Sequence, residues 1–220
     1  MKVLVAGATG ETGRLIVKEL VKQNISVRAM VRDLEKAKEI LPENVDLVVA
    51  DLQKKSTLET AIADCDYVIS AAASRPPNLL GPFQIDYVAT KNLIDVAEEK
   101  GIKQFVLVTS LCVSKFFHPL NLFGLILFWK KQTEEYLIGS SLNYSIVRPG
   151  GLSNEPEAIA PVVISGADSL FEGRIARQLV AEICVAALDD PNASKQIIEA
   201  VTDKDTSEKP YGELFEAIAS

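Results

Sequence analysis

The sequence predicts a single α/β domain of the doubly wound type, with helices on both faces of a parallel β-sheet. Short apolar segments alternate with segments of helical periodicity over most of the chain. Residues 104–109 are continuously apolar and rich in β-branched residues, which is typical of a strand buried on both faces. A glycine-rich turn joins the first apolar segment to the first helical one. We therefore expect one domain over residues 1–220, with 1–150 as its core and 151–220 as a smaller segment on the ligand side.

The individual elements follow from this alternation. After a first strand that begins at Lys2 and the helix behind the glycine-rich turn, the predicted strands are 25–31, 45–50, 67–71, 104–109, 144–147, 160–164 and 196–201. The predicted helices are 34–41, 56–63 with Ser56 as N-cap, 84–100 with Gly101 as C-terminal cap, 122–138, 177–188 and 211–219. Residues 75–82 are rich in proline and are expected to be irregular.

Charge and cysteine content limit the partners that are expected. The formal net charge is −7, the pI is about 4.9 and no basic run is present, so we expect no nucleic-acid partner. A small molecule or a protein is the expected partner, with the chain as a monomer or a homodimer. Cys65, Cys112 and Cys184 are far apart and lack metal-ligand spacing, which predicts reduced thiols and no metal site.

The apolar segment 116–129 raises the question of a membrane span. His118, Pro119 and Asn121 interrupt it, and it falls short of the roughly 20 apolar residues that a spanning helix needs. We expect no transmembrane segment. Because the first strand begins two residues into the chain, we also expect no signal or transit peptide, and a cytoplasmic or plastid-stromal protein.

The glycine-rich turn has the spacing of a dinucleotide-binding turn. Gly7 lets the chain leave the strand sharply, Gly10 lets a pyrophosphate approach the backbone, and Gly13 lets the helix pack close to the sheet. The N–H groups of the first helical turn then face the phosphates, with the helix dipole behind them. The expected cofactor-binding residues of this turn are Gly7, Thr9, Gly10, Glu11, Thr12 and Gly13.

The residue at the end of the second strand favours one dinucleotide over the other. An acidic residue there accepts hydrogen bonds from the ribose 2′-OH of NAD, whereas the guanidinium of Arg32 suits the 2′-phosphate of NADP. Asp33 follows at once and would hold the position if the strand were one residue longer. Residues 27, 29 and 31 are expected to face inward and residues 28, 30 and 32 outward, with Asp33 as N-cap of the next helix. This register favours Arg32 and NADP(H), and a solvated arginine is the alternative.

The other strand ends supply further candidates, because a ligand of a doubly wound sheet lies at the carboxyl ends of its strands. Asp51, with Leu52, is the candidate for an adenine contact, and the small residues Ala71, Ala72 and Ala73 would let the backbone approach the ribose. Thr109 and Ser110 would place hydroxyls near the nicotinamide, with Lys130 on the helix that follows. Backbone groups for the carboxamide would come from Pro149, Gly150 and Gly151.

Taken together, these motifs resemble an atypical short-chain dehydrogenase/reductase with a Rossmann fold. The resemblance covers nearly the whole chain and is greatest to the NmrA-like and flavin-reductase-like branch. The run 110–121 resembles, more narrowly, cyanobacterial and plastid relatives of the dehydrogenase-like subunit of the chloroplast import translocon. The resemblance implies NADP binding through the turn, Arg32 and Asp51, and a catalytic-region role for Ser110 and Lys130.

One departure from that family matters for the chemistry. The wider superfamily uses Tyr-x-x-x-Lys on this helix, where the lysine lowers the pKa of the tyrosine that protonates the substrate. Here Ile126 stands four residues before Lys130, and Leu127 four before Lys131. Tyr87 and Tyr136 lie on nearby helices, but Tyr136 is expected to be a packing residue. A flavin or quinone acceptor needs no positioned protein acid, so such a reductase can work without the tyrosine.

The loop after the fifth strand carries two further candidates. His118 is the one histidine of the sequence and is either an acid/base group of the pocket or an ordinary loop residue. Phe116 and Phe117 are the best candidates for an aromatic wall, whereas the neighbouring aromatic residues are expected mainly in the core. The sequence thus predicts an NADPH-dependent reductase of a flat apolar acceptor, with Ser110, Lys130 and His118 in its catalytic region. The alternative is a protein that binds NADP(H) without turnover and reports the redox state to a protein partner.

Overall fold

The computed structural model describes residues 1–74, 77–155 and 159–219, and their main feature is an eight-stranded sheet in the order β3-β2-β1-β4-β5-β6-β10-β8. Its neighbouring strands are parallel except β10 and β8, which are antiparallel. Its strands are β1 (Lys2–Ala6), β2 (Ser26–Val31), β3 (Asp46–Val49), β4 (Tyr67–Ser70), β5 (Gln104–Val108), β6 (Tyr144–Pro149), β8 (Val162–Ser165) and β10 (Gln196–Thr202). This architecture confirms the predicted doubly wound α/β class.

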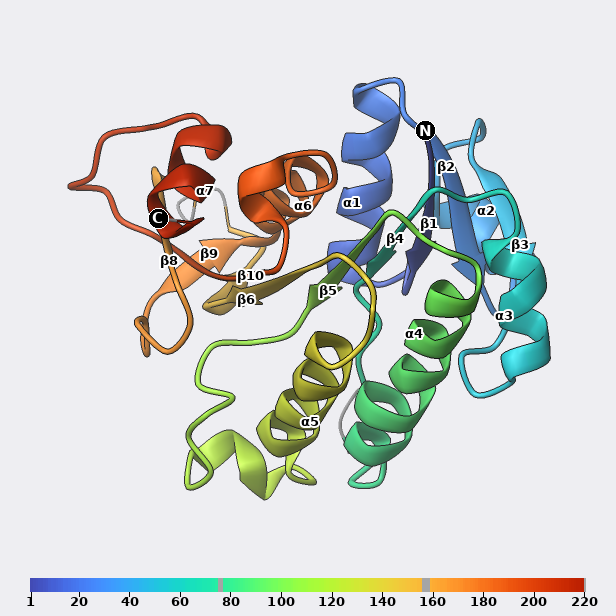
Figure 1. The fold of residues 1–220 in the computed structure, drawn as a ribbon, viewed down its shortest axis with the longest axis horizontal. Coiled ribbons are helices and arrows are strands. Elements are labelled where there is room, and N and C mark those ends of the chain that lie inside the picture. The colour runs from blue at the N-terminus through green and yellow to red at the C-terminus, as the bar shows by residue number, and fades with distance from the viewer. Residues whose placement is uncertain (75–76, 156–158, 220) are drawn as a thin grey trace.

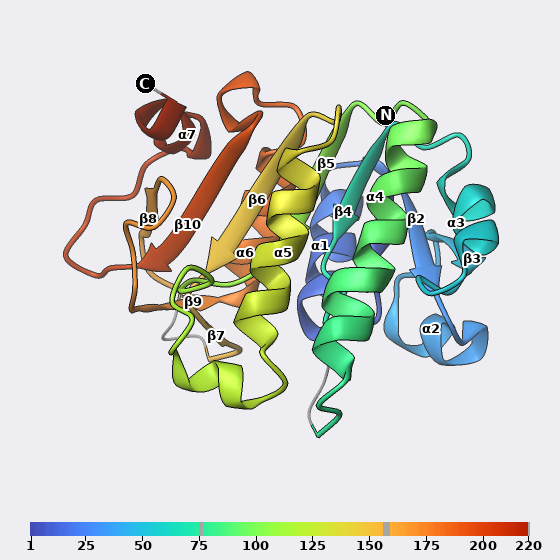
Figure 2. The ribbon, with the colours of Figure 1, turned by 60° about the horizontal axis from the view of Figure 1, so that its bottom comes forward.

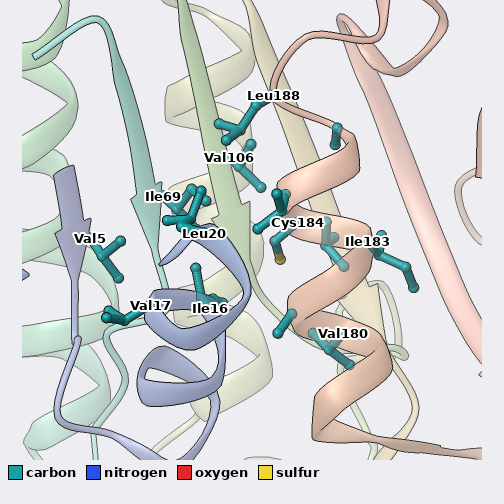
Figure 3. Close-up of a cluster of buried hydrophobic side chains, with 14 of the residues drawn as sticks. Val5, Ile16, Val17, Leu20, Ile69, Val106, Val180, Ile183, Cys184 and Leu188 are labelled. Carbon is teal, nitrogen blue, oxygen red and sulfur yellow. The ribbon is translucent and has the colours of Figure 1, made fainter. Parts of the chain in front are cut away.

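Helices cover both faces of the sheet, with α1 and α6 on one side and α4 and α5 on the other (Figure 1). The α-helices are α1 (Glu11–Lys22), α2 (Leu34–Ile40), α3 (Lys55–Ile62), α4 (Thr90–Glu99), α5 (Ile126–Ile138), α6 (Arg177–Ala186) and α7 (Tyr211–Ala219). Two large buried apolar clusters result, one on each face, and the described residues hold a third, smaller one around Leu111 and Leu127. In the first, α1 and α6 meet over the sheet at Ile16, Leu20, Val180 and Cys184 (Figure 3). Complete burial raises the pKa of the Cys184 thiol, which makes it an inert core residue.

The helix predicted at 84–100 consists of two segments. A π-helical segment, η1 (Pro82–Ala89), precedes α4, and its proline occupies the first turn, where no amide donor is needed. Gly101 has φ +67° just beyond α4, which confirms its role as C-terminal cap. Within the segment predicted to be irregular, residues 75 and 76 lie outside the described part of the chain.

Two helix starts differ from prediction. Helix α3 begins at Lys55 with Lys54 as N-cap, so Ser56 lies in its first turn; the backbone turn from Asp51 to Lys54 closes before the serine is reached. Helix α5 begins at Ile126 rather than Leu122, because Gly124 and Leu125 both have positive φ. A short 3₁₀ turn, η2 (Pro119–Leu122), precedes it.

Residues beyond 150 contribute to the main sheet as well as to its ligand side. Strands β8 and β10 extend the sheet, and α6 packs on α1. The sequence pattern missed two three-residue strands, β7 (Gly151–Ser153) and β9 (Arg174–Ala176), which form a small parallel sheet of their own. A third short helical turn, η4 (Pro191–Ala193), precedes β10.

The carboxyl ends of the parallel strands share one edge, toward which the arrowheads of β2, β6 and β10 point (Figure 2). The segments β7, β9 and η2 lie at this same edge. No helix in the described ranges has the length and apolar character needed to cross a bilayer.

Candidate functional site

The glycine turn between β1 and α1 leaves no space for side chains. Gly7 has φ +76°, and a Cβ there would lie 2.7 Å from the amide nitrogen of Ala72, at the end of β4. A Cβ on Gly13 would overlap the carbonyl oxygen of Gly7. The turn is closed by a 2.9 Å hydrogen bond from the Gly10 amide to that same carbonyl. Gly7 and Gly13 are therefore required by the close approach of the helix, the turn and β4, whereas a Cβ on Gly10 would make a tight contact of 3.1 Å with the Gly7 carbonyl oxygen.

The first turn of α1 presents free backbone donors. The first amide of this turn to find an acceptor is that of Arg14, which donates to Gly10 at 2.9 Å. Within the described residues the amides of Glu11, Thr12 and Gly13 have no acceptor. The Glu11 carboxylate turns away to Arg177, with Oε2 and Nη2 3.0 Å apart. Three free amides behind a glycine-rich turn fit a pyrophosphate group.

Arg32 follows directly on β2 and its side chain is exposed. Asp33 is the N-cap of α2, since its Oδ1 accepts the Lys36 amide at 3.1 Å. The expected strand end and cap are therefore confirmed. Met30 was expected to face outward but is buried, because the second face of the sheet is also covered by helices.

Asp51 lies beside the end of β2, where Arg32 is located. The residue before Asp51, Ala50, donates its amide to the carbonyl of Val31, the residue before Arg32, at 3.0 Å. The Asp51 carboxylate accepts the Gln53 amide at 3.0 Å, and Leu52 is buried. Asp51 thus helps to shape the turn after β3 and lies at the strand edge where an adenine contact was expected.

Lys130 forms an ion pair that the sequence did not predict. Its Nζ lies 2.8 Å from Oδ1 of Asp86 on η1, and both residues are buried. Oδ2 of Asp86 accepts the Ser74 amide at 3.1 Å. Ser74 directly follows Ala71–Ala73, of which Ala71 and Ala72 lie against Gly7. Asp86 and Ser74 therefore link Lys130 to the loop of Ala71 and Ala72, which in turn lies against Gly7.

A buried charge network lies one helical turn further along α5. Arg148 is fully buried at the end of β6 and contacts Glu134 at 2.6 Å, Asp168 at 2.9 Å and Glu199 at 3.0 Å. Burial alone would lower the pKa of Arg148, but its hydrogen bonds to Glu134 and the charges around it raise that pKa above the ordinary value. The sequence analysis missed this network; its one signal was an arginine inside an otherwise buried strand.

A carboxylate of this network accepts a hydrogen bond from the hydroxyl of a predicted cofactor-binding residue. Thr109 donates to Oε1 of Glu134 at 2.6 Å, so its proton is not available to a ligand. Ser110, the next residue, is half-buried at the end of β5. Among the described residues Thr109 has an acceptor for its hydroxyl proton and Ser110 has none, so Ser110 is the better candidate of the two to donate to a ligand.

In the turn formed by Pro149, Gly150 and Gly151, the backbone amides of both glycines are hydrogen-bonded within the protein. The Gly150 amide donates to Ala200 and the Gly151 amide to Gly173, each at 2.9 Å. A Cβ on Gly150 would lie 2.7 Å from the Gly173 carbonyl oxygen, so packing alone requires this glycine. These two amides are consequently not free to bind a carboxamide.

His118 serves locally as a cap. Its Nδ1 accepts the Leu120 amide at 3.2 Å at the start of η2. Asn121 has a similar role, because its Oδ1 accepts the amides of Leu127 and Phe128 at the start of α5. The side chain of Asn121 also donates to the Phe116 carbonyl at 2.7 Å, which ties the loop to α5.

Aromatic rings on α5 and η1, the two segments that carry Lys130 and Asp86, pack against one another. Trp129 packs against Phe128, Phe83 and Tyr87 with ring centroids 4.9, 4.8 and 5.5 Å apart. Phe116 extends this row toward the loop, 6.0 Å from Phe128. Beyond it Phe117 is 97% exposed, so the predicted phenylalanine pair lies at the surface end of the row.

Comparison with known proteins identifies the family of this chain. The model of the NAD(P)H-binding family matches residues 7–191. The chloroplastic protein At2g34460 of Arabidopsis thaliana is 39% identical over 99% of this chain and 82% of its own length. Protein TIC 62 of the same plant is 37% identical over 99% of this chain, which spans only 38% of TIC 62.

Two further proteins extend the comparison. Sanguinarine reductase of Eschscholzia californica is 31% identical over 96% of this chain and 90% of its own length. A solved structure from Bacillus halodurans, described as an NAD-dependent epimerase/dehydratase, is 31% identical with a TM-score of 0.88 over 99% of this chain and all of its own. The expected resemblance to plastid relatives is confirmed. The chain belongs to the NAD(P)H-binding family.

Proposed function

We propose that the protein is an NADPH-dependent reductase of a flat, apolar acceptor such as a flavin or quinone. The observation that carries this proposal is that Lys130 is linked through Asp86 and Ser74 to the loop that lies against Gly7, at the edge where the α1 amides are free. NADPH bound there would supply a hydride to the acceptor. Lys130 would bind the nicotinamide ribose, Ser110 would orient the acceptor or the nicotinamide, and the aromatic rings would hold a flat molecule against it.

Arg32 favours NADP(H) over NAD(H) in this proposal. Its guanidinium is exposed at the end of β2, and Asp33, the acidic residue that would suit NAD, is occupied as a helix cap. A 2′-phosphate would accept charge-assisted hydrogen bonds from Arg32. The 151–220 segment, with β7 and β9 at the ligand edge, would shape the acceptor side.

The missing tyrosine fits an acceptor that needs no protein acid. Residues 126 and 127 of α5 are isoleucine and leucine, and the Tyr136 hydroxyl donates to Asp95 at 2.6 Å instead. Sanguinarine reductase among the relatives supports a reductase. The chloroplastic relatives support the plastid stroma as one location, with the cytoplasm as the other.

A second function, an NADP(H)-binding redox sensor that acts through a protein partner, is favoured by one observation. Leu122 is 82% exposed and Phe123 55% exposed next to Phe117, which is an unusual concentration of exposed apolar side chains beside a cofactor site. Such a sensor would be a monomer or a homodimer that binds the cofactor without consuming it.

Absorbance of the reduced nicotinamide separates the two functions. NADPH is mixed with the protein alone, with FMN and with a soluble quinone, and Arg32→Asp serves as the control. Consumption that requires an acceptor and is lost in the control supports the reductase. Tight binding without consumption over the whole panel supports the sensor.

A further inference from the structure

The Lys130–Asp86 ion pair holds a buried ammonium with donors to spare. The side chains of Lys130 and Asp86 are only 10% and 1% exposed. The 2.8 Å contact lacks the alignment of a hydrogen bond, so charge holds the pair together. An ammonium has three N–H donors, and within the described residues Lys130 has no other polar partner. The Lys130 side chain keeps some exposure, so its remaining donors are open to oxygen acceptors from a ligand.

Asp86 is itself fixed by groups on two other segments. Its Oδ2 accepts the Ser74 amide from the loop after β4. Its backbone carbonyl accepts the Thr133 hydroxyl of α5 at 2.6 Å, one turn beyond Lys130. The π-helical turn that carries Asp86 is a rare conformation that recurs at functional sites. Backbone and carboxylate of Asp86 are therefore both held in place relative to α5.

The position of the pair identifies the kind of group that it suits. Through Ser74 it adjoins the loop that lies against Gly7, at the same edge as the free amides of α1. The charges of Lys130 and Asp86 cancel, so the pair suits neutral hydroxyls, whereas the α1 amides suit phosphate. We propose that Asp86 is a positioning residue that holds the Lys130 ammonium with its remaining donors toward the hydroxyls of the nicotinamide ribose. This inference rests on the proposed cofactor and adds the residue that directs Lys130.

Two ligands and one conservative variant test this role. Asp86→Asn keeps the side-chain volume and an oxygen for the Ser74 amide but removes the charge. Trp129, the single tryptophan of the sequence, is adjacent to Lys130 and reports NADPH binding through its emission. We expect the Kd of NADPH to rise about tenfold. The Kd of adenosine 2′,5′-bisphosphate, measured by calorimetry, should stay within about twofold, because this ligand has no nicotinamide ribose.

A purely structural role for the pair predicts a different pattern. Lys130→Met leaves a buried carboxylate unpaired and should lower the melting temperature. The double variant Asp86→Asn/Lys130→Met should regain that stability and still bind NADPH about tenfold more weakly than wild type. Recovery of both stability and binding in the double variant would overturn the proposal.

Two other results would also overturn it: a wild-type Kd for NADPH in Asp86→Asn, or equal loss of both ligands in that variant. Failure of the wild-type protein to bind NADPH would overturn this inference together with the cofactor. Binding without reduction of any acceptor would overturn the reductase alone, since none of these measurements needs turnover.

Discussion

Arg148 and Glu134 form an ion pair in which neither side chain is exposed to solvent, with Nη2 and Oε2 2.6 Å apart. Glu134 lies four residues after Lys130, so the two share one face of α5. Because Glu134 also accepts the Thr109 hydroxyl, the pair fixes α5 against the ends of both β5 and β6. The position of the helix that carries Lys130 therefore depends on this charge network.

Removal of this arginine should be costly. Arg148→Met would leave Glu134 and Glu199 buried without their cation, and breaking a buried pair in this way costs about 3–5 kcal/mol. Urea unfolding at pH 7 measures the change in the free energy of unfolding. The control is Arg174→Met, whose exposed pair with Glu155 spans 3.7 Å and should contribute about 0–1 kcal/mol. Equal losses in the two variants would contradict a structural role for the network.

Cofactor preference should depend on Arg32. Arg32→Asp should raise the Kd of NADP⁺ about 100-fold, equivalent to about 2.7 kcal/mol, because a charge-assisted pair is replaced by repulsion. The Kd of NAD⁺, which has no 2′-phosphate, should change far less. Trp129 emission measures both constants. Lys36→Asp makes the same charge change on an exposed residue of α2 and should leave the preference intact. Equal weakening of both dinucleotides by Arg32→Asp would place Arg32 away from the 2′-phosphate.

The glycine turn should not tolerate a methyl group at Gly13. Gly13→Ala forces a Cβ into the Gly7 carbonyl oxygen, and backbone atoms there cannot move without displacing α1 from the sheet. We expect a loss of about 1–3 kcal/mol in unfolding free energy, the usual range for overpacking, together with weaker NADPH binding. Gly166→Ala is the matched control, since a Cβ at Gly166 meets nothing within 4 Å. A neutral Gly13→Ala would show that α1 can shift without cost.

The elements that could be predicted from the sequence are those whose apolar residues recur with the spacing of a strand or a helix. Alternating apolar segments gave the sheet and its helices, and the cap Asp33 fixed where β2 ends. The π-helical turn at Asp86 was missed because no sequence period distinguishes it from an α-helix. Strands β7 and β9 were missed because three residues carry no pattern.

Within the candidate site, the positions that follow strands could be predicted and the others could not. Gly7 follows β1 and Arg32 follows β2, and neighbouring parallel strands end at the same edge of a sheet. The partners of Lys130 and Arg148 are contacts between residues far apart in sequence, such as Lys130 with Asp86 and Arg148 with Glu199. Those contacts depend on how the elements pack, which the sequence does not show. The same holds for the Gly150 and Gly151 amides, which donate to carbonyl groups of the protein.

Acid stability should depend on an ion pair at the opposite, amino-terminal edge of the sheet. The Lys103 ammonium and the Lys2 amide, each 2.9 Å from the Asp66 carboxylate, lower the pKa of Asp66 from its ordinary value of 3.8 to about 2. Since the folded-state pKa is the lower one, ionised Asp66 stabilises the fold above about pH 4. That contribution is lost as the pH falls from 3.8 to about 2.

Asp66→Asn should accordingly be less stable than wild type at pH 7, and the difference should become small as the pH falls to about 2. Thermal unfolding of both proteins across this range measures it. Glu216→Gln, at an exposed carboxylate of α7, controls for the general effect of removing one negative charge. A deficit of Asp66→Asn that stays constant from pH 7 to pH 2 would mean that the substitution disturbs packing or hydrogen bonding rather than the titrating charge.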